Sequence, residues 1–226
     1  MQFKEVGNKA NPCIVMIHGL MGSWKQFKEY IDLLSNCYYL ILPILDGFDP
    51  ETPSTYISAE EEASIIAEYL KSKEIHSVYM VMGISIGGTV AFEMVYQNKV
   101  AIKYAVIDGA SLSPQNKFFA LFSPKVPANI RKKMTKESYK NVLTDCNTYS
   151  TFTDFDAAET KMLFIYGSRE MRFGNGRSVK TLRYLPGANI NIIDGYGHCG
   201  FLSETKRYLE EIDFMFNTNL ASENKK

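Results

Sequence analysis

Three kinds of side chain in this sequence could act together in a nucleophilic reaction. Ser85 lies in a Gly-Ile-Ser-Ile-Gly motif at residues 83–87, and His198 lies in a glycine-rich segment at residues 195–200. A serine hydroxyl is a weak nucleophile at neutral pH, so it needs a histidine base to accept its proton. A carboxylate that orients the histidine and two N–H donors for the oxyanion would complete a site for acyl transfer.

The residues around Ser85 predict a sharp turn between a buried strand and a helix. Residues 78–82 form a short apolar run, typical of a strand covered on both faces, and residues 89–98 continue at helical spacing. Glycines at 83 and 87 suit a turn in which two backbone segments lie too close for a Cβ atom. Such a turn exposes the hydroxyl and places the Ile86 N–H where it would stabilise an oxyanion. A glycine-rich loop with an incidental serine is the alternative interpretation.

His198 is predicted to lie on a loop between the last strand and the last helix. A loop histidine beyond one strand end can reach a serine at a neighbouring strand end. A surface histidine in a flexible turn is the alternative for this segment taken alone. Its pairing with Ser85 favours a catalytic role.

The rest of the chain alternates between apolar strands and amphipathic helices, which implies a mostly parallel, doubly wound α/β sheet. A capping box of Ser58 and Glu61 marks the start of one helix, and Ser23 can cap another. Strands are predicted within residues 11–19, 38–43, 78–82, 103–108, 161–167 and 189–193, and helices after Ser23, after Ser58, and at 89–98, 178–184 and 203–216.

The alternation stops between residues 111 and about 160, where only a helix at 137–143 is indicated. We interpret the chain as one domain, residues 1–226, that carries a small, mainly helical cap at about 111–160. Phe118, Phe119 and Phe122 concentrate aromatic area in this segment. They are candidate substrate-binding residues, either as the core of the cap or as the wall of an acyl pocket.

Composition excludes several classes of function. The chain of 226 residues has 25 basic and 25 acidic residues, so no net field favours nucleic acid or an anionic membrane. No signal peptide or transmembrane run is recognisable, and a cytoplasmic location is expected. Four scattered cysteines and three histidines share no metal-ligand spacing, so we expect no metal and no organic cofactor.

Three motifs, in the order His18-Gly19, the Ser85 turn and Gly197-His198, resemble those of α/β-hydrolase fold esterases and lipases, and small cytoplasmic members in particular. The resemblance covers essentially the whole chain. It implies that Ser85 is the nucleophile and His198 the base. It also implies an oxyanion hole formed by the backbone N–H groups of Leu20 and Ile86, with His18 in a structural role.

The sequence departs from that family at two points. It leaves little room for two leading antiparallel strands, although residues 3–6 could supply one. The usual Gly-x-x-Asp after the next-to-last strand is Gly167-Ser-Arg-Glu170 here. We favour Glu170 as the acid because it stands at the usual position of the acid in that family, and a glutamate is also ionised at neutral pH. Asp108, at the end of the preceding strand, is the rival.

These features predict a serine hydrolase that acts on a small-molecule carboxylic ester. A thioesterase, a lactone or carbon–carbon bond hydrolase and an acyltransferase would share the same three residues and differ in pocket shape. A non-catalytic ligand receptor on a hydrolase scaffold is the alternative from another class. Three arginines, Arg169, Arg172 and Arg177, are interpreted as a solvated loop, with contact to an acidic substrate as the alternative. The oligomeric state is not indicated.

Overall fold

The computed structural model describes residues 1–20, 22–49, 51–114, 134–150, 159–173 and 175–222. Its centre is a seven-stranded sheet in the order β1-β3-β2-β4-β5-β6-β7. The strand β1 pairs antiparallel with β3, and all other neighbours are parallel. The strands are β1 (Gln2–Val6), β2 (Cys13–Ile17), β3 (Tyr39–Ile44), β4 (Ser77–Ile84), β5 (Ala101–Asp108), β6 (Lys161–Gly167) and β7 (Ala188–Ile193).

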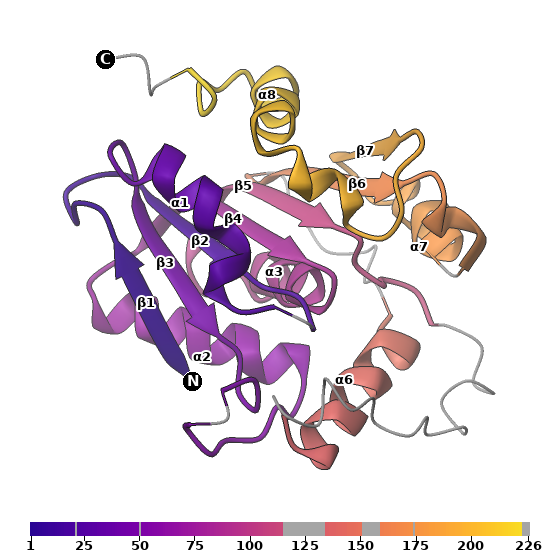
Figure 1. The fold of residues 1–226 in the computed structure, drawn as a ribbon, viewed down its shortest axis with the longest axis horizontal. Helices are drawn as coiled ribbons and strands as arrows, with labels where there is room; N and C mark the ends of the chain where they lie inside the picture. The colour runs from indigo at the N-terminus through magenta and orange to yellow at the C-terminus, as the bar shows by residue number, and fades with distance from the viewer. Residues whose placement is uncertain (21, 50, 115–133, 151–158, 174, 223–226) are drawn as a thin grey trace.

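Helices cover both faces of this sheet (Figure 1). The α-helices are α1 (Lys28–Leu34), α2 (Ala59–Ser72), α3 (Ile86–Gln97), α6 (Lys136–Thr148), α7 (Asn175–Leu182) and α8 (Thr205–Phe216). Three short 3-10 helices, η1 (Trp24–Phe27), η2 (Glu170–Phe173) and η3 (Gly200–Ser203), precede α1, α7 and α8. Within the described residues, no helix is both long enough and apolar enough to cross a membrane.

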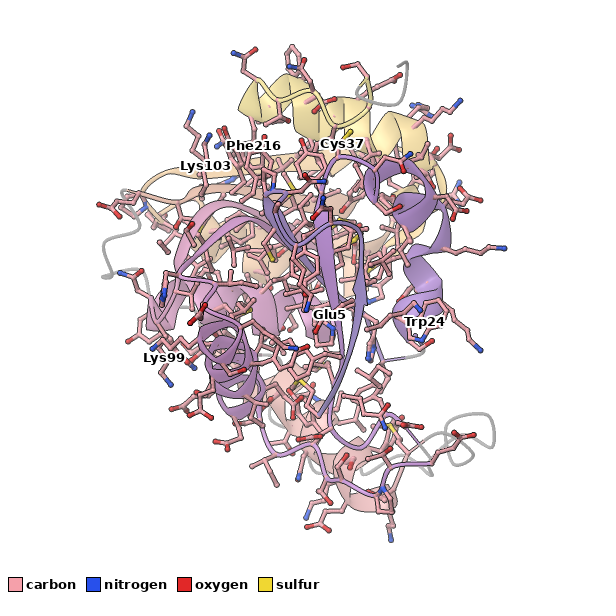
Figure 2. The ribbon with its side chains drawn as sticks, turned by 90° about the vertical axis from the view of Figure 1, so that its left-hand side faces the viewer. Glu5, Trp24, Cys37, Lys99, Lys103 and Phe216 are labelled. Atoms are coloured by element: carbon pink, nitrogen blue, oxygen red, sulfur yellow. The ribbon has the colours of Figure 1, made fainter. Side chains whose placement is uncertain are left out.

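The apolar core forms two layers, one on each face of the sheet. Buried side chains of α1 and α8 fill one layer, and those of α2, α3 and α7 fill the other. Phe216 of α8, labelled in Figure 2, stacks on Tyr104 of β5 with the ring centroids 4.7 Å apart. The prediction of a mostly parallel, doubly wound sheet is therefore confirmed.

The strand β1 supplies a single leading antiparallel strand, in the segment where the sequence has room for one. Its Glu5 (Figure 2) accepts hydrogen bonds from the hydroxyl groups of Tyr39 and Tyr69. The same carboxylate lies 2.9 Å from the ammonium group of Lys73. The bond from Tyr39 is the largest of the effects that hold the pKa of Glu5 well below its usual range. These contacts join the edge strand to β3 and α2.

The described part of the segment between β5 and β6 contains α6, which is longer than the predicted helix at 137–143. The Asp145 carboxylate accepts hydrogen bonds from the Tyr56 hydroxyl and the Ala59 N–H, both at 2.6 Å. Ser138 Oγ accepts from the Tyr56 N–H at 3.2 Å. The helix is thereby joined to the segment that leads into α2. Three predicted substrate-binding residues of the cap, Phe118, Phe119 and Phe122, lie outside the described residues.

Candidate active site

Ser85 lies at the turn between β4 and α3, and the turn requires glycine on both sides of it. A Cβ atom added at Gly83 would lie 2.1 Å from the Gly87 carbonyl oxygen. One added at Gly87 would lie 2.4 Å from the carbonyl oxygens of Ile17 and His18. Because no side chain fits at these distances, glycine alone allows the helix to leave the strand so sharply.

The backbone of Ser85 itself is strained, with φ of 56° and ψ of −118°. Non-glycine residues rarely adopt positive φ, and strain of this kind concentrates at functional sites. The Ser85 N–H donates to the Asp108 carbonyl oxygen at 2.7 Å, which ties the turn to the end of β5. The turn therefore holds the serine side chain at the carboxyl end of the sheet.

His198 lies between Ser85 and Glu170. Its Nε2 is 2.9 Å from Ser85 Oγ, and its Nδ1 is 2.7 Å from Glu170 Oε2. With the Nδ1 proton donated to the carboxylate, Nε2 is the nitrogen that can accept the serine proton. Ser85 comes from the turn between β4 and α3, His198 from the loop after β7, and Glu170 from the start of η2. The fold brings these three side chains together.

Glu170 is buried and its carboxylate is fully engaged. Oε1 accepts the Gly167 N–H at 2.7 Å, and Oε2 accepts the Asn175 side-chain amide at 2.6 Å as well as facing His198. The hydrogen bond from the Gly167 N–H holds the glutamate side chain, which is longer than that of aspartate, against the end of β6. Asn175, the first residue of α7, was not predicted as a site residue. Nothing in its sequence context distinguishes it from a helix-starting polar residue.

Asp108, the rival acid, does not contact the imidazole nitrogens, which Ser85 and Glu170 occupy. Its side chain is buried beneath the site, and its Oδ2 has no hydrogen-bond partner among the described residues. Burial, followed by the charge of Glu170, raises the pKa of Asp108 to about 7. Of these two carboxylates, Glu170 is the one that lies within hydrogen-bond distance of Nδ1 of His198.

The electrostatics of His198 follow from this arrangement. The hydrogen bond to Glu170 is the largest cause that raises the pKa of His198, and partial burial opposes it. The charges of Glu170 and Asp108 act in the same direction as that hydrogen bond. A raised pKa makes the imidazole a stronger base and stabilises the imidazolium that would form during catalysis.

Gly109 allows the histidine loop to lie against the end of β5. Its φ is +64°, and an added Cβ atom would lie 2.6 Å from Cys199 Sγ and 3.0 Å from Cε1 of His198. A side chain at this position would therefore displace the imidazole from Ser85. The positive φ adds a second reason for glycine.

The predicted oxyanion donors flank the serine. A Cβ atom at Gly19 would lie 3.4 Å from Ser85 Cβ, so the loop that continues into Leu20 passes beside the nucleophile. Ile86 is the first residue of α3. Neither the Leu20 nor the Ile86 N–H donates a hydrogen bond to an acceptor within the described residues.

His18 is fully buried and orders the same loop. Its Nδ1 donates to the Gly19 carbonyl at 2.9 Å, and its Nε2 accepts the Leu45 N–H at 3.2 Å. Burial lowers the pKa of His18 to about 4, so the ring is neutral with its proton on Nδ1. This arrangement agrees with a structural role and leaves no nitrogen for proton transfer.

A pocket of about 420 Å³ opens beside Glu170 and His198, and Ser85 is not among the residues that line it. Its lining comes from the loop after β6, the start of α7 and the histidine loop: Arg169, Glu170, Asn175, Gly197 and His198. A substrate group in this pocket would lie against the imidazole of His198. The predicted acyl-pocket phenylalanines lie outside the described residues and add nothing to this lining.

Solved structures share the fold over nearly the whole chain at low sequence identity. A protein described as an alpha/beta hydrolase from Desulfitobacterium hafniense has a TM-score of 0.77 at 17% identity, covering 96% of this chain and 100% of its own. For a thermophilic esterase from Thermogutta terrifontis the TM-score is 0.72 at 16% identity, covering 96% and 92%. For a meta-cleavage product hydrolase from Pseudomonas fluorescens it is 0.73 at 16% identity, covering 95% and 93%.

The amino-acid sequence also matches a relative and a family model. The chain is 38% identical to an uncharacterized hydrolase of Saccharomyces cerevisiae over 55 residues, which make up 24% of this chain and 19% of the yeast protein. The match therefore spans about a fifth of that relative. The sequence model described as alpha/beta hydrolase fold matches residues 12–129, just over half of the chain, including β2 to β5 and the Ser85 turn. This match shows that the chain belongs to the alpha/beta hydrolase fold family, and the strand order of the sheet agrees with it.

Proposed function

We propose that this protein is a serine hydrolase that cleaves carboxylic esters through an acyl-enzyme on Ser85. The observation that supports this proposal best is the continuous chain of contacts from Ser85 Oγ through His198 to Glu170, at 2.9 and 2.7 Å. A strained serine turn and two neighbouring N–H groups without an acceptor among the described residues add further support. Small-molecule esters are the substrate class that this chemistry suits.

In the proposed reaction, Ser85 Oγ attacks the ester carbonyl while its proton passes to Nε2 of His198. The oxyanion of the tetrahedral intermediate accepts hydrogen bonds from the N–H groups of Leu20 and Ile86. His198 then donates its proton to the departing alkoxide, which leaves as the alcohol, and Ser85 keeps the acyl group. A water molecule attacks the acyl carbon with His198 as base, and the acid is released as Ser85 regains its proton.

Within this proposal Glu170 keeps the Nδ1 proton of His198 in place and stabilises the imidazolium. A thioester, lactone, carbon–carbon bond or acyl-acceptor other than water would use the same three side chains. The esterase from Thermogutta terrifontis and a carboxylesterase from Nitrososphaera gargenis, which shares the fold at 14% identity, favour the ester. The meta-cleavage product hydrolase keeps the carbon–carbon alternative in view. A receptor without activity would not need the strained serine.

A panel of p-nitrophenyl esters with increasing acyl length tests the proposal. We expect turnover of at least one member, followed by p-nitrophenolate release, and an optimum in acyl length set by the pocket. Ser85→Ala should abolish the release, which separates catalysis by this site from contaminating esterases. Absence of turnover for every ester, with turnover of a thioester or a carbon–carbon substrate that depends on Ser85, would replace the ester by that alternative.

A further inference from the structure

The side-chain amide of Asn175, the first residue of α7, donates two hydrogen bonds at the edge of the site. One N–H is directed at Oε2 of Glu170 at 2.6 Å, and the other at the Gly109 carbonyl oxygen at 3.3 Å. A carboxylate and a carbonyl offer only acceptor atoms, so the nitrogen of the amide, and not its oxygen, faces them. Asn175 therefore joins the acid of the site to the turn after β5.

The helix that carries Asn175 is bonded to the segment that follows this turn. The Leu112 N–H donates to Ser178 Oγ at 2.9 Å, and the hydroxyl groups of Ser113 and Thr181 lie 2.6 Å apart. Buried apolar side chains of α7 also belong to the core on that face of the sheet. The amide of Asn175 is thus presented by an element whose own position is fixed.

The carboxylate of Glu170 keeps its direction only if both of its oxygens are held. A glutamate side chain has one rotatable bond more than aspartate, so it has more orientations to lose. The Gly167 N–H holds Oε1 at 2.7 Å, and that bond alone would let the carboxylate pivot about Oε1. Asn175 holds Oε2, the oxygen that faces Nδ1 of His198 at 2.7 Å. The two donors together aim the carboxylate at the imidazole.

We infer that Asn175 is a positioning residue, which keeps the Glu170 carboxylate directed at Nδ1 of His198; its effect on turnover rests on the proposed function. Among the described residues, the amide bonds to Glu170 and Gly109 and not to Ser85 or the imidazole. Its influence on the reaction therefore passes through Glu170. A hydrogen bond to an ionised group is stronger than one between neutral groups, so its loss frees Glu170 to turn away.

Asn175→Ala should lower kcat for ester hydrolysis about 10-fold, because a hydrogen bond to a charged group is lost, and should change KM little. Asn175→Asp has the same size and suits the first turn of a helix, so it should fold. Its oxygen repels Glu170, and kcat should fall at least as far. Lys180→Ala, at an exposed position of the same helix, is the control and should keep wild-type kcat. Wild-type kcat in both Asn175 variants overturns the inference.

A double variant tests whether Asn175 acts through Glu170. Without the glutamate side chain, the amide has no carboxylate to position. In the Glu170→Ala background, Asn175→Ala should therefore change kcat by less than about twofold. The same 10-fold loss in both backgrounds would mean that Asn175 acts independently of Glu170, which contradicts the inference.

The pKa of His198 gives a readout that a merely structural role of Asn175 would not move. The hydrogen bond to Glu170 is the largest cause that raises this pKa, and the charges of Glu170 and Asp108 act in the same direction. If Asn175→Ala lets Glu170 turn away, the pKa of His198 falls. If the amide only withdrew charge from Glu170, its loss would raise that pKa instead. The direction of the shift thus separates the two roles.

NMR titration of the His198 Cε1–H signal in the resting protein measures this pKa without any substrate. The signal is assigned by its absence from His198→Ala. We expect a lower pKa in Asn175→Ala than in the wild type and Lys180→Ala. That result supports the inference even if no ester is hydrolysed, so failure of the esterase proposal remains a separate outcome. An unchanged or higher pKa of His198 in Asn175→Ala overturns the inference.

Discussion

Ser85→Ala and His198→Ala should each lower kcat for ester hydrolysis about 10⁴-fold or more, and the double variant should be little worse than either. The two side chains act as one unit, because the 2.9 Å contact from Ser85 Oγ to His198 Nε2 is the path of the serine proton. Removal of either partner leaves the other without a role. Steady-state kinetics of the three variants on the best p-nitrophenyl ester give the comparison.

Two surface substitutions serve as matched controls. Ser72→Ala removes an exposed hydroxyl at the end of α2, and His76→Ala removes an exposed imidazole just before β4. His76 precedes the amino end of the strand whose carboxyl end leads to Ser85, so it lies at the opposite edge of the sheet. Both controls should keep near-wild-type turnover. Near-normal turnover in Ser85→Ala or His198→Ala themselves would refute the mechanism.

Glu170→Gln should lower kcat by up to about 10⁴-fold, whereas Asp108→Asn should cost far less. Glutamine can no longer stabilise the imidazolium, and its amide can present a donor to Nδ1 and favour the wrong tautomer. Asp108 has no contact with the imidazole nitrogens and acts on His198 only through its charge. Both variants should be compared at equal thermal stability, because both side chains are buried.

The pH profile of the same variants gives a second readout. Activity requires neutral His198, so it rises with pH through the pKa of the imidazole. Glu170 raises that pKa, chiefly through its hydrogen bond to Nδ1. Its loss should therefore move the rising limb of the residual activity to lower pH. If Asp108→Asn abolishes turnover while Glu170→Gln spares it, the assignment of Glu170 is wrong.

The serine turn was predictable because its constraints are local. A Cβ atom added at Gly83 or Gly87 would lie only 2.1 or 2.4 Å from a backbone oxygen, and backbone packing this close requires glycine in the sequence. The capping box is equally local, since Ser58 Oγ accepts the Glu61 N–H at 3.2 Å as the sequence indicates. The parallel sheet followed from the alternation of apolar strands and helices. These features need no knowledge of distant contacts.

The identity of the acid depends on contacts that sequence does not specify. Asp108 is the last residue of β5 and Glu170 follows β6, and because these strands are neighbours in the sheet, both residues lie at the same edge. Which of the two carboxylates reaches His198 depends on side-chain length and on two donors that support Glu170, the Gly167 N–H and the Asn175 amide. Asn175 gains its role from the fold, because α7 starts beside η2. Propensity alone could not assign that role.

The length of α6 was underestimated for a similar reason. Its last turn contains polar residues with low helix propensity, so the predicted helix stopped at 143. In the structure the side chains of Thr144 and Thr148 bond back to carbonyls four residues earlier, at 2.9 and 2.8 Å. Asp145 holds this turn against Tyr56, which is far away in sequence. Tertiary contacts therefore extend a helix that its own residues would end.

Mass spectrometry after treatment with a fluorophosphonate tests the central claim most directly. An activated serine oxygen displaces fluoride from phosphorus and forms a stable covalent adduct. We expect one adduct per chain, located on Ser85, with loss of esterase activity in proportion to labelling. Ser85→Ala should remain unlabelled under the same conditions. Turnover of esters by a protein whose Ser85 stays unmodified, or whose adduct maps to another residue, would contradict the account.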